Sequence, residues 1–132
     1  MILLDTHVWV WWLTNPDLLP PKAMRVIREA MKNYSVAISS MSAWEIAMLC
    51  AKGRLEFATN YREFIRQTEK LAFVKFIQPD NTIFLNSVEM PDYPGKDPAD
   101  RIIVATANHL SAALITKDEH MHAYRQVRTV WA

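Results

Sequence analysis

Cysteine and glycine are both scarce in this sequence, which has one Cys and two Gly among its 132 residues. The single cysteine, Cys50, excludes an intrachain disulfide and a four-cysteine metal site, and nothing else in the sequence marks an oxidising compartment. Because glycine occurs only at positions 53 and 95, most turns must be built from proline, asparagine and aspartate.

The sequence also lacks a charge excess and a long apolar run. Its formal net charge is +1, so charge alone does not indicate nucleic-acid binding, and any site for a polyanion must come from local arrangement or from bound metal. No apolar run has the length of a membrane-spanning helix, and the amino terminus lacks the basic region and cleavage site of a signal peptide. We therefore expect a soluble, cytoplasmic protein with no membrane partner.

What remains is the composition of an ordinary globular domain, with 51% hydrophobic and 22% charged residues and no repeat, low-complexity segment or flexible linker. We predict one domain over residues 1–132. Short apolar segments alternate with helical patterns, which predicts an α/β fold whose parallel sheet is covered on both faces. The predicted strands are 2–5, 35–38, 73–77, 113–116 and 127–131, and the predicted helices are 8–13, 21–32, 39–51, 61–71, 80–88 and 100–110.

Two aspartates lie at or just after the ends of predicted strands. Asp5 ends the segment Ile-Leu-Leu, and Asp118 comes shortly after Ala-Leu-Ile-Thr. Ligands of open α/β sheets bind at the carboxyl ends of the strands, so we expect both carboxylates at the same edge of the sheet. Taken alone, each of these aspartates could equally be a turn or cap residue.

Three further acids lie in or before predicted helices. Glu45 interrupts the apolar segment SAWEIAMLCA, where residues 42–45 also match a capping box that would give this acid a purely local role. In KDPADRIIVATA, Asp97 is predicted to cap the helix, with Pro98 in its first turn. Asp100 complements the helix dipole there but is not needed as a cap, and we expect this helix end to reach the same sheet edge.

Acids gathered in this way would repel one another strongly. Two carboxylates about 5 Å apart repel by roughly 3 kcal/mol at an effective dielectric constant near 20, so a cluster must be protonated, dispersed or neutralised by a cation. Oxygen ligands alone indicate Mg²⁺ or Mn²⁺. His120 and His122 would diverge on a strand or a helix, which argues against one shared metal there.

Four motifs in chain order, LLDTHVWVWW, SAWEIAMLCAKGRL, KDPADRIIVATA and LITKDEH, together resemble the PIN-domain nucleases, and more narrowly the VapC-like toxin ribonucleases of type II toxin–antitoxin systems. The resemblance covers nearly the whole chain. It matches the acidic quartet of that family to Asp5, Glu45, Asp100 and Asp118. Thr6 and Thr116 match hydroxyl positions that flank the metals, and Asp97 matches an auxiliary acid.

The resemblance implies a three-layer α/β/α fold with a parallel central sheet, usually as a homodimer. It also implies a Mg²⁺- or Mn²⁺-dependent endoribonuclease that leaves 5′-phosphate and 3′-hydroxyl ends. A cognate antitoxin would neutralise it by laying a peptide segment across the acidic pocket. On this hypothesis Asp5 and Asp100 hold the principal ion, and Glu45 and Asp118 complete the site directly or through water; the number of ions and the RNA target stay open.

Other functions fit the motifs less well. A phosphatase with an aspartyl nucleophile needs a second Asp two residues after the first, but Thr6 and His7 follow Asp5. A signalling receiver domain needs a paired acid after the first strand and a lysine after the last strand. Neither pattern is persuasive in this sequence. The stronger alternative is a non-catalytic PIN-like module that binds RNA or a protein.

Basic residues beside the acids are candidates for RNA phosphate contacts, and we predict this role for Arg101 and Lys117. A further basic stripe on the second predicted helix is either a solvated face or a guide for RNA; it consists of Lys22, Arg25, Arg28 and Lys32.

The dense tryptophans Trp9, Trp11 and Trp12 allow base stacking, core packing or an interface. We predict at least one of them in the core and the remainder at an interface. Trp44 and Trp131 are predicted to lie in the core.

Overall fold

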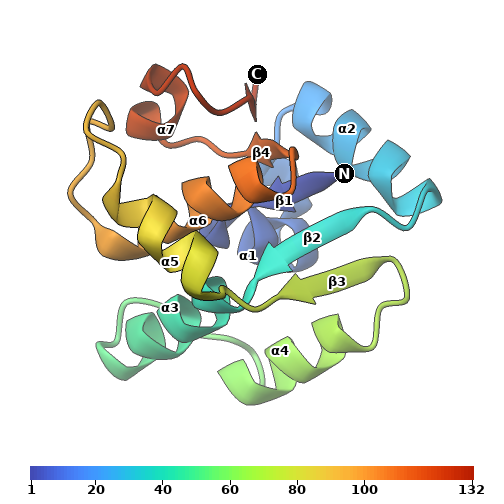
Figure 1. Ribbon diagram of the computed structural model, residues 1–132. Helices are drawn as coiled ribbons and strands as arrows, with labels where there is room; N and C mark the ends of the chain where they lie inside the picture. The colour runs from blue at the N-terminus through green and yellow to red at the C-terminus, as the bar shows by residue number, and fades with distance from the viewer.

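A central five-stranded sheet organises the molecule, and the computed structural model describes all 132 residues. All neighbouring strands are parallel, in the order β3-β2-β1-β4-β5. The strands are β1 (Ile2–Leu4), β2 (Val36–Ser39), β3 (Val74–Ile77), β4 (Ala113–Ile115) and β5 (Thr129–Val130). The predicted three-layer α/β/α architecture is confirmed (Figure 1).

Seven α-helices and one short 3-10 helix connect these strands. They are α1 (Thr6–Thr14), η1 (Pro16–Leu18), α2 (Pro21–Lys32), α3 (Ser40–Ala51), α4 (Tyr61–Glu69), α5 (Asn81–Val88), α6 (Pro98–His109) and α7 (Glu119–Ala123). None of the helices combines the length and the apolar composition needed to cross a bilayer.

The alternation of side chains along β1 divides the core into two layers. Ile2 and Leu4 pack with the apolar residues of α1 and α2 on one face, while Leu3 packs with those of α5, α6 and α7 on the other. Successive strand residues point to opposite faces, and both faces are covered, so all three residues are buried. This burial holds the carboxyl ends of β1 and β4 side by side, with Leu4 opposite Ile115.

Several helix starts differ from the prediction, and α6 begins at Pro98 rather than residue 100. Helix α1 begins at Thr6 rather than residue 8, because the Asp5 side chain caps it by accepting from the Thr6 N–H. Helix α3 is capped by Ser39, so the expectation of a capping box at residues 42–45 is wrong. Glu45 lies in the second turn of the helix.

Helix α7 was not predicted from the sequence. It is five residues long and buries only Met121, so it carries too little apolar periodicity to be recognised. The side chain of Asp118 caps it.

The tryptophans divide between core and surface. Trp9 and Trp12 are buried, which confirms the prediction that at least one of the cluster lies in the core. Trp11 is partly buried and packs against Trp131, with ring centroids 6.0 Å apart. The prediction of a buried Trp44 is wrong: its side chain is 55% exposed, because the helix buries other residues, notably Ser42 and Ile46, against the rest of the molecule.

Candidate metal centre

Asp5 is the most firmly held acid of the site. It lies where β1 ends and α1 begins, and it is 8% exposed. Its Oδ1 accepts from the Thr6 N–H at 2.8 Å, and its Oδ2 accepts from the Thr116 hydroxyl at 2.7 Å. Two donors from adjacent strand ends therefore fix the orientation of this carboxylate.

Glu45 reaches the same place from α3. The Thr6 hydroxyl donates to Glu45 Oε1 at 2.7 Å and lies 2.8 Å from Ser42 Oγ. The acid inside an apolar helix is thus explained by a contact with a residue 39 positions away and not by a local cap. The sequence pattern singled out Ser42 only as part of a local capping box and did not predict its contact with the Thr6 hydroxyl.

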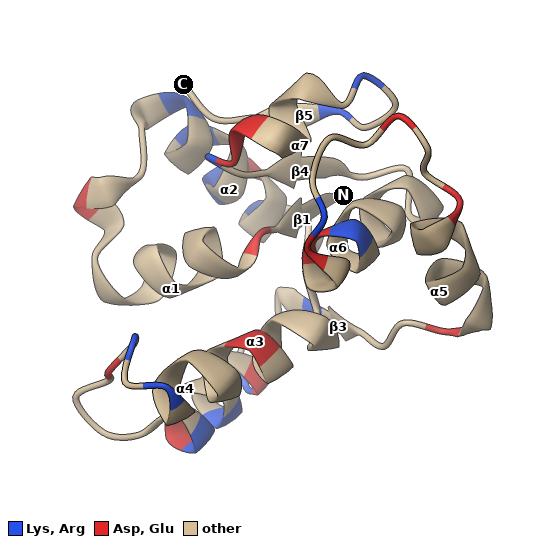
Figure 2. Ribbon diagram, turned by 90° about the vertical axis from the view of Figure 1, so that its left-hand side faces the viewer, with Lys and Arg blue, Asp and Glu red and all other residues tan.

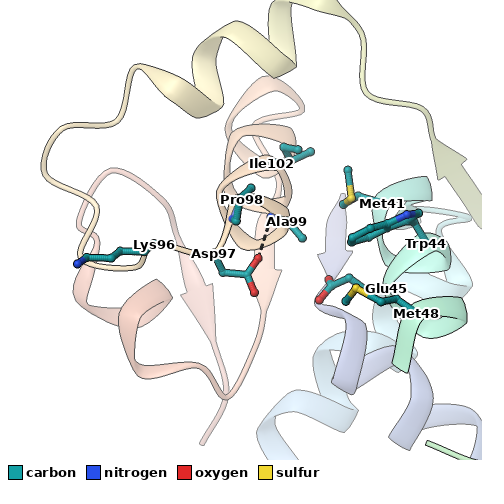
Figure 3. A pocket seen from close by; sticks show the side chains of 9 residues that line it. All are labelled: Met41, Trp44, Glu45, Met48, Lys96, Asp97, Pro98, Ala99 and Ile102. Carbon is teal, nitrogen blue, oxygen red and sulfur yellow. Dashed lines mark hydrogen bonds between the residues drawn. The ribbon is translucent and has the colours of Figure 1, made fainter. Parts of the chain in front are cut away.

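Asp97 and Asp100 lie at the start of α6, opposite Glu45. Asp97 Oδ1 accepts from the Ala99 N–H at 2.8 Å and weakly from the Asp100 N–H at 3.4 Å, so the predicted cap is confirmed. One carboxylate oxygen each from Glu45, Asp97 and Asp100 lie within 4.8 Å of one another. Figure 3 shows Glu45 and Asp97 facing each other from α3 and the start of α6. Asp97 therefore caps a helix and also belongs to the closest group of acids.

Asp118 is linked to Asp5 through one shared hydroxyl. The Thr116 oxygen that donates to Asp5 also accepts from the Asp118 N–H at 3.0 Å, while Asp118 Oδ1 accepts from the Met121 N–H at 3.0 Å. Thr116 is fully buried. The residue therefore connects the acid after β1 to the acid after β4.

These acids border one open cavity of about 620 Å³. Figure 2 shows acidic positions at the end of β1, on α3, at the start of α6 and before α7 on the same side of the molecule. Three basic residues, Lys52, Arg54 and Lys117, also line the cavity. Its acidic and hydroxyl-bearing lining consists of Asp5, Thr6, Glu45, Asp97, Asp100, Asp118 and Glu119.

Burial and mutual repulsion disfavour the ionised forms of these acids. Burial, followed by the charges of neighbouring acids, raises the pKa of Asp100 to about 8. Burial, opposed by the Thr6 hydrogen bond, raises the pKa of Glu45 to about 7. Burial also raises the pKa of Asp5, although the hydrogen bonds from Thr116 and Thr6 lower it in part.

No basic side chain forms a salt bridge with these acids, since the one salt bridge of the chain joins Arg66 to Glu63 on α4. The all-oxygen donor set, with several carboxylates and no cysteine or histidine at hydrogen-bonding distance from them, suits Mg²⁺ or Mn²⁺. The residues present therefore fit a divalent cation.

The two predicted phosphate-contact residues have different surroundings. Lys117 lines the acidic cavity, and its ammonium lies 5.9 Å from the Trp11 ring centroid. The Arg101 guanidinium instead donates twice to the Met90 carbonyl, at 3.1 and 3.2 Å, and lies over the Tyr93 ring. Arg101 does not line the acidic cavity.

Of the remaining candidates, His7 borders the acidic cavity, whereas the basic stripe of α2 does not. The basic stripe of α2 is exposed and contributes nothing to the cavity lining. His122 holds the end of β4 in place, because its Nε2 lies 2.6 Å from the Thr116 carbonyl oxygen and its Nδ1 lies 2.9 Å from the Thr129 hydroxyl. His7 lines the cavity from an exposed position.

Comparison with known proteins agrees with this architecture. Residues 2–127 match the family model of the PIN domain. The chain is 33% identical over 133 residues to Ribonuclease VapC22 of Mycobacterium tuberculosis, and the match covers 98% of each protein.

Solved structures share the fold at lower sequence identity. The crystal structure of VapBC2 from Rickettsia felis, bound to a DNA fragment from its promoter, contains a chain that matches with a TM-score of 0.73 and 17% identity over 100% of both chains. The crystal structure of DNA-bound VapBC from Salmonella typhimurium matches with a TM-score of 0.69 and 15% identity over 98% of both chains.

A parallel sheet with carboxylates gathered at its carboxyl edge defines the class: an α/β protein with an acidic site suited to a divalent cation. Within that class the chain belongs to the PIN-domain family, as the family model and the VapC22 relative show. The family resemblance of the four sequence motifs is confirmed.

The raised pKa values predict how the ion-free protein responds to pH. Between about pH 5 and pH 9 the native state binds more protons than the unfolded chain, because Glu45 and Asp100 titrate near 7 and 8 instead of at their ordinary values. The free energy of unfolding in EDTA should therefore fall as pH rises through this range. Urea titrations followed by tryptophan fluorescence test this slope, which Asp100→Asn should reduce; a flat or rising profile would contradict the assignment.

Proposed function

We propose that this chain is a Mg²⁺- or Mn²⁺-dependent endoribonuclease and the toxin of a toxin–antitoxin pair. The observation that carries the proposal is the convergence of Asp5, Glu45, Asp100 and Asp118, from four separate segments, on one cavity that also has basic residues in its wall. Similarity over 98% of its length to a protein named as a ribonuclease supports the same function.

In this proposal Asp5 and Asp100 hold the principal ion, and Glu45 and Asp118 complete the site directly or through water. Asp97 is auxiliary, since its carboxylate lies in the closest group of acids while it also caps α6. When bound, the divalent cation lowers the pKa of a water molecule and offsets negative charge on the phosphoryl oxygens.

The chain's own hydroxyls keep the ligands in place before substrate arrives. Thr116 orients Asp5 and the backbone of Asp118, and Thr6 orients Glu45. Such preorganisation matters because a polar group already aimed at the reacting atoms needs no rearrangement in the transition state.

The basic wall of the cavity is suited to the RNA backbone. Lys117, Lys52 and Arg54 line the same cavity as the acids and would contact phosphates of the RNA backbone, as Lys and Arg do in most nucleic-acid complexes. Arg101 is less suited to this role, because its guanidinium is already engaged by the Met90 carbonyl. Attack of water on phosphorus, with cleavage of the bond to O3′, leaves 5′-phosphate and 3′-hydroxyl ends.

Removal of either principal ligand should abolish cleavage. Asp5→Asn and Asp100→Asn should each lower the rate of Mg²⁺-dependent cleavage of single-stranded or transfer RNA by at least about 100-fold. Loss of a residue that only hydrogen-bonds to a metal ligand already lowers metal affinity or activity 10- to 100-fold. Both variants should remain folded, because each substitution removes a repelled charge.

Asp92→Asn is the matched control, since Asp92 is an exposed acid in the loop before α6. This variant should cleave RNA at the wild-type rate. Cleavage by Asp5→Asn or Asp100→Asn at the wild-type rate would overturn the assignment. If the wild type binds RNA but cleaves none with Mg²⁺ or Mn²⁺, the alternative holds, and the chain is a non-catalytic PIN-like RNA- or protein-binding module.

A cognate antitoxin is the proposed protein partner. Solved structures that share the fold come from VapBC assemblies, and the acidic cavity of this chain adjoins an apolar groove on α3 and α6. The groove is lined by Met41, Trp44, Met48, Pro98, Ala99 and Ile102, with Glu45, Lys96 and Asp97 at its polar side (Figure 3). A peptide with apolar side chains and one basic side chain would fill the groove and reach the acids.

The antitoxin proposal predicts that a small DNA-binding protein encoded next to this chain co-purifies with it and suppresses RNA cleavage. Deleting the part of the antitoxin that lies outside its DNA-binding domain should restore cleavage, because this part would carry the inhibitory peptide. Co-expression followed by affinity purification and a cleavage assay measures both effects. A neighbouring protein that neither binds nor inhibits would contradict the proposal.

A homodimer is the second proposed assembly, through exposed apolar side chains of α5. Phe84, Leu85 and Val88 are 42%, 62% and 76% exposed. Phe84 and Val88 border a groove that shares Pro98 and Ile102 with the groove beside Trp44. Contiguous exposed apolar side chains of this kind mark interaction surfaces, and a twofold pair of copies would cover the α5 face of each subunit.

Charge placed in the α5 face should separate the dimer. Val88→Arg introduces a charge at a highly exposed position, so the variant should fold normally. Its molar mass by light scattering should be that of a monomer, whereas the wild type should have the molar mass of a dimer. Leu18→Arg is the matched control, because Leu18 is a 50% exposed leucine of η1 and the variant should stay dimeric. A monomeric wild type, or a dimeric Val88→Arg variant, would refute this interface.

A further inference from the structure

An exposed histidine beside the acidic site uses both of its ring nitrogens on neighbouring segments of the chain. His122 lies on α7 and is exposed, yet its Nε2 lies 2.6 Å from the Thr116 carbonyl oxygen and its Nδ1 lies 2.9 Å from the Thr129 hydroxyl. A carbonyl oxygen can only accept, so Nε2 donates, and in the neutral ring Nδ1 accepts from the hydroxyl. The ring therefore links α7 to the end of β4 and to β5.

Thr116, which follows β4, is held through both of its backbone groups. Its N–H donates to the Val130 carbonyl at 3.2 Å, which continues the pairing of β4 with β5. Strand β5 ends at Val130, and the donor to the Thr116 carbonyl comes from the His122 side chain. The histidine therefore takes the place that a further strand residue would have in the ladder.

The Thr116 hydroxyl carries the effect of this backbone contact to two acids. It donates to Asp5 Oδ2 at 2.7 Å and accepts from the Asp118 N–H at 3.0 Å. Thr116 is fully buried, so its side chain has little freedom to adjust on its own. A displacement of the Thr116 backbone would therefore move a hydroxyl that two candidate ligands share.

Helix α7 has anchors of its own that do not involve the His122 ring. The Asp118 side chain caps the helix by accepting from the Met121 N–H at 3.0 Å, and the Met121 side chain is fully buried. The helix is thus fixed at its start and at its apolar contact with the core. The two contacts of the ring act instead on the strand ends, and through Thr116 on the acids.

We propose that His122 is a positioning residue of the metal centre, which fixes the Thr116 backbone so that the Thr116 hydroxyl aims Asp5 at a bound divalent cation. This inference rests on the proposed function, because it assumes that Asp5 is a ligand. Residues that hydrogen-bond to ligating carboxylates set the orientation of the ligand and the affinity for the metal. His122 acts one residue further out, through Thr116.

His122→Gln and His122→Asn form a pair of variants that separates the two contacts of the ring. The glutamine amide nitrogen lies as many bonds from Cα as Nε2 and can still donate to the Thr116 carbonyl, whereas the shorter asparagine amide matches Nδ1 in reach. Mn²⁺ binding to the ion-free protein, measured by isothermal titration calorimetry, should stay within about 2-fold of the wild type for His122→Gln. It should weaken by roughly 5-fold for His122→Asn, less than the 10- to 100-fold for loss of a direct partner of a ligand.

His120→Asn is the matched control, because His120 is an exposed histidine of the same helix outside this chain of hydrogen bonds. Its Mn²⁺ affinity should equal that of the wild type. Wild-type affinity in His122→Asn, or an equal loss in His122→Gln and His122→Asn, would overturn the inference and leave the proposed function intact. A wild type that takes up no Mn²⁺ would instead overturn the proposed function itself.

A double variant separates positioning from a general loosening of the fold. In a Thr116→Val background the hydroxyl through which His122 acts is absent, so His122→Asn should cause no further loss of Mn²⁺ affinity. The non-additivity of the two substitutions measures their coupling. If His122→Asn weakens Mn²⁺ binding equally with and without the Thr116 hydroxyl, its role is merely structural and the inference is wrong.

Discussion

Repulsion among carboxylates that the fold holds close together is the constraint on which the rest of this structure depends. Three of them have raised pKa values, because burial and neighbouring charge both disfavour the ionised form. Without a neutralising cation such an arrangement works against folding. The hydrogen bonds that maintain it come from two threonine hydroxyls, those of Thr6 and Thr116. A site that is unfavourable when empty and rigidly held is well prepared to bind a divalent ion.

The fold accommodates these acids by giving several of them a second, local role. Asp5, Asp97 and Asp118 cap α1, α6 and α7 through backbone N–H groups, and a negative charge is favoured at a helix N-terminus. The cap and the candidate ligand are therefore the same residue. One oxygen serves the helix, and at Asp5 the other also accepts from the Thr116 hydroxyl. At these positions capping does not exclude a metal-binding role, because the two roles are compatible in the structure.

The acidic cavity and the apolar groove beside it share Glu45, Met48 and Asp97. A molecule that covers the groove therefore also touches the acids, which is the arrangement that inhibition by a docked peptide requires. The exposed side chain of Trp44 belongs to this groove, so its solvent exposure, unexpected for an aromatic residue in an apolar helix, is consistent with a partner surface.

The sequence by itself determined the alternation of strands and helices, the two-sided burial of the sheet, and the placement of Asp5 and Asp118 just after strands at one edge of it. These features follow from local hydrophobic pattern and from the rule that ligands of parallel sheets gather at the carboxyl edge. Only the tertiary structure decided that Glu45 accepts from Thr6, that Arg101 turns to a backbone carbonyl, and that Trp44 is exposed. Periodicity describes one segment at a time, whereas these side-chain directions depend on which distant segments pack against each other, and an isolated pattern of residues carries no such information.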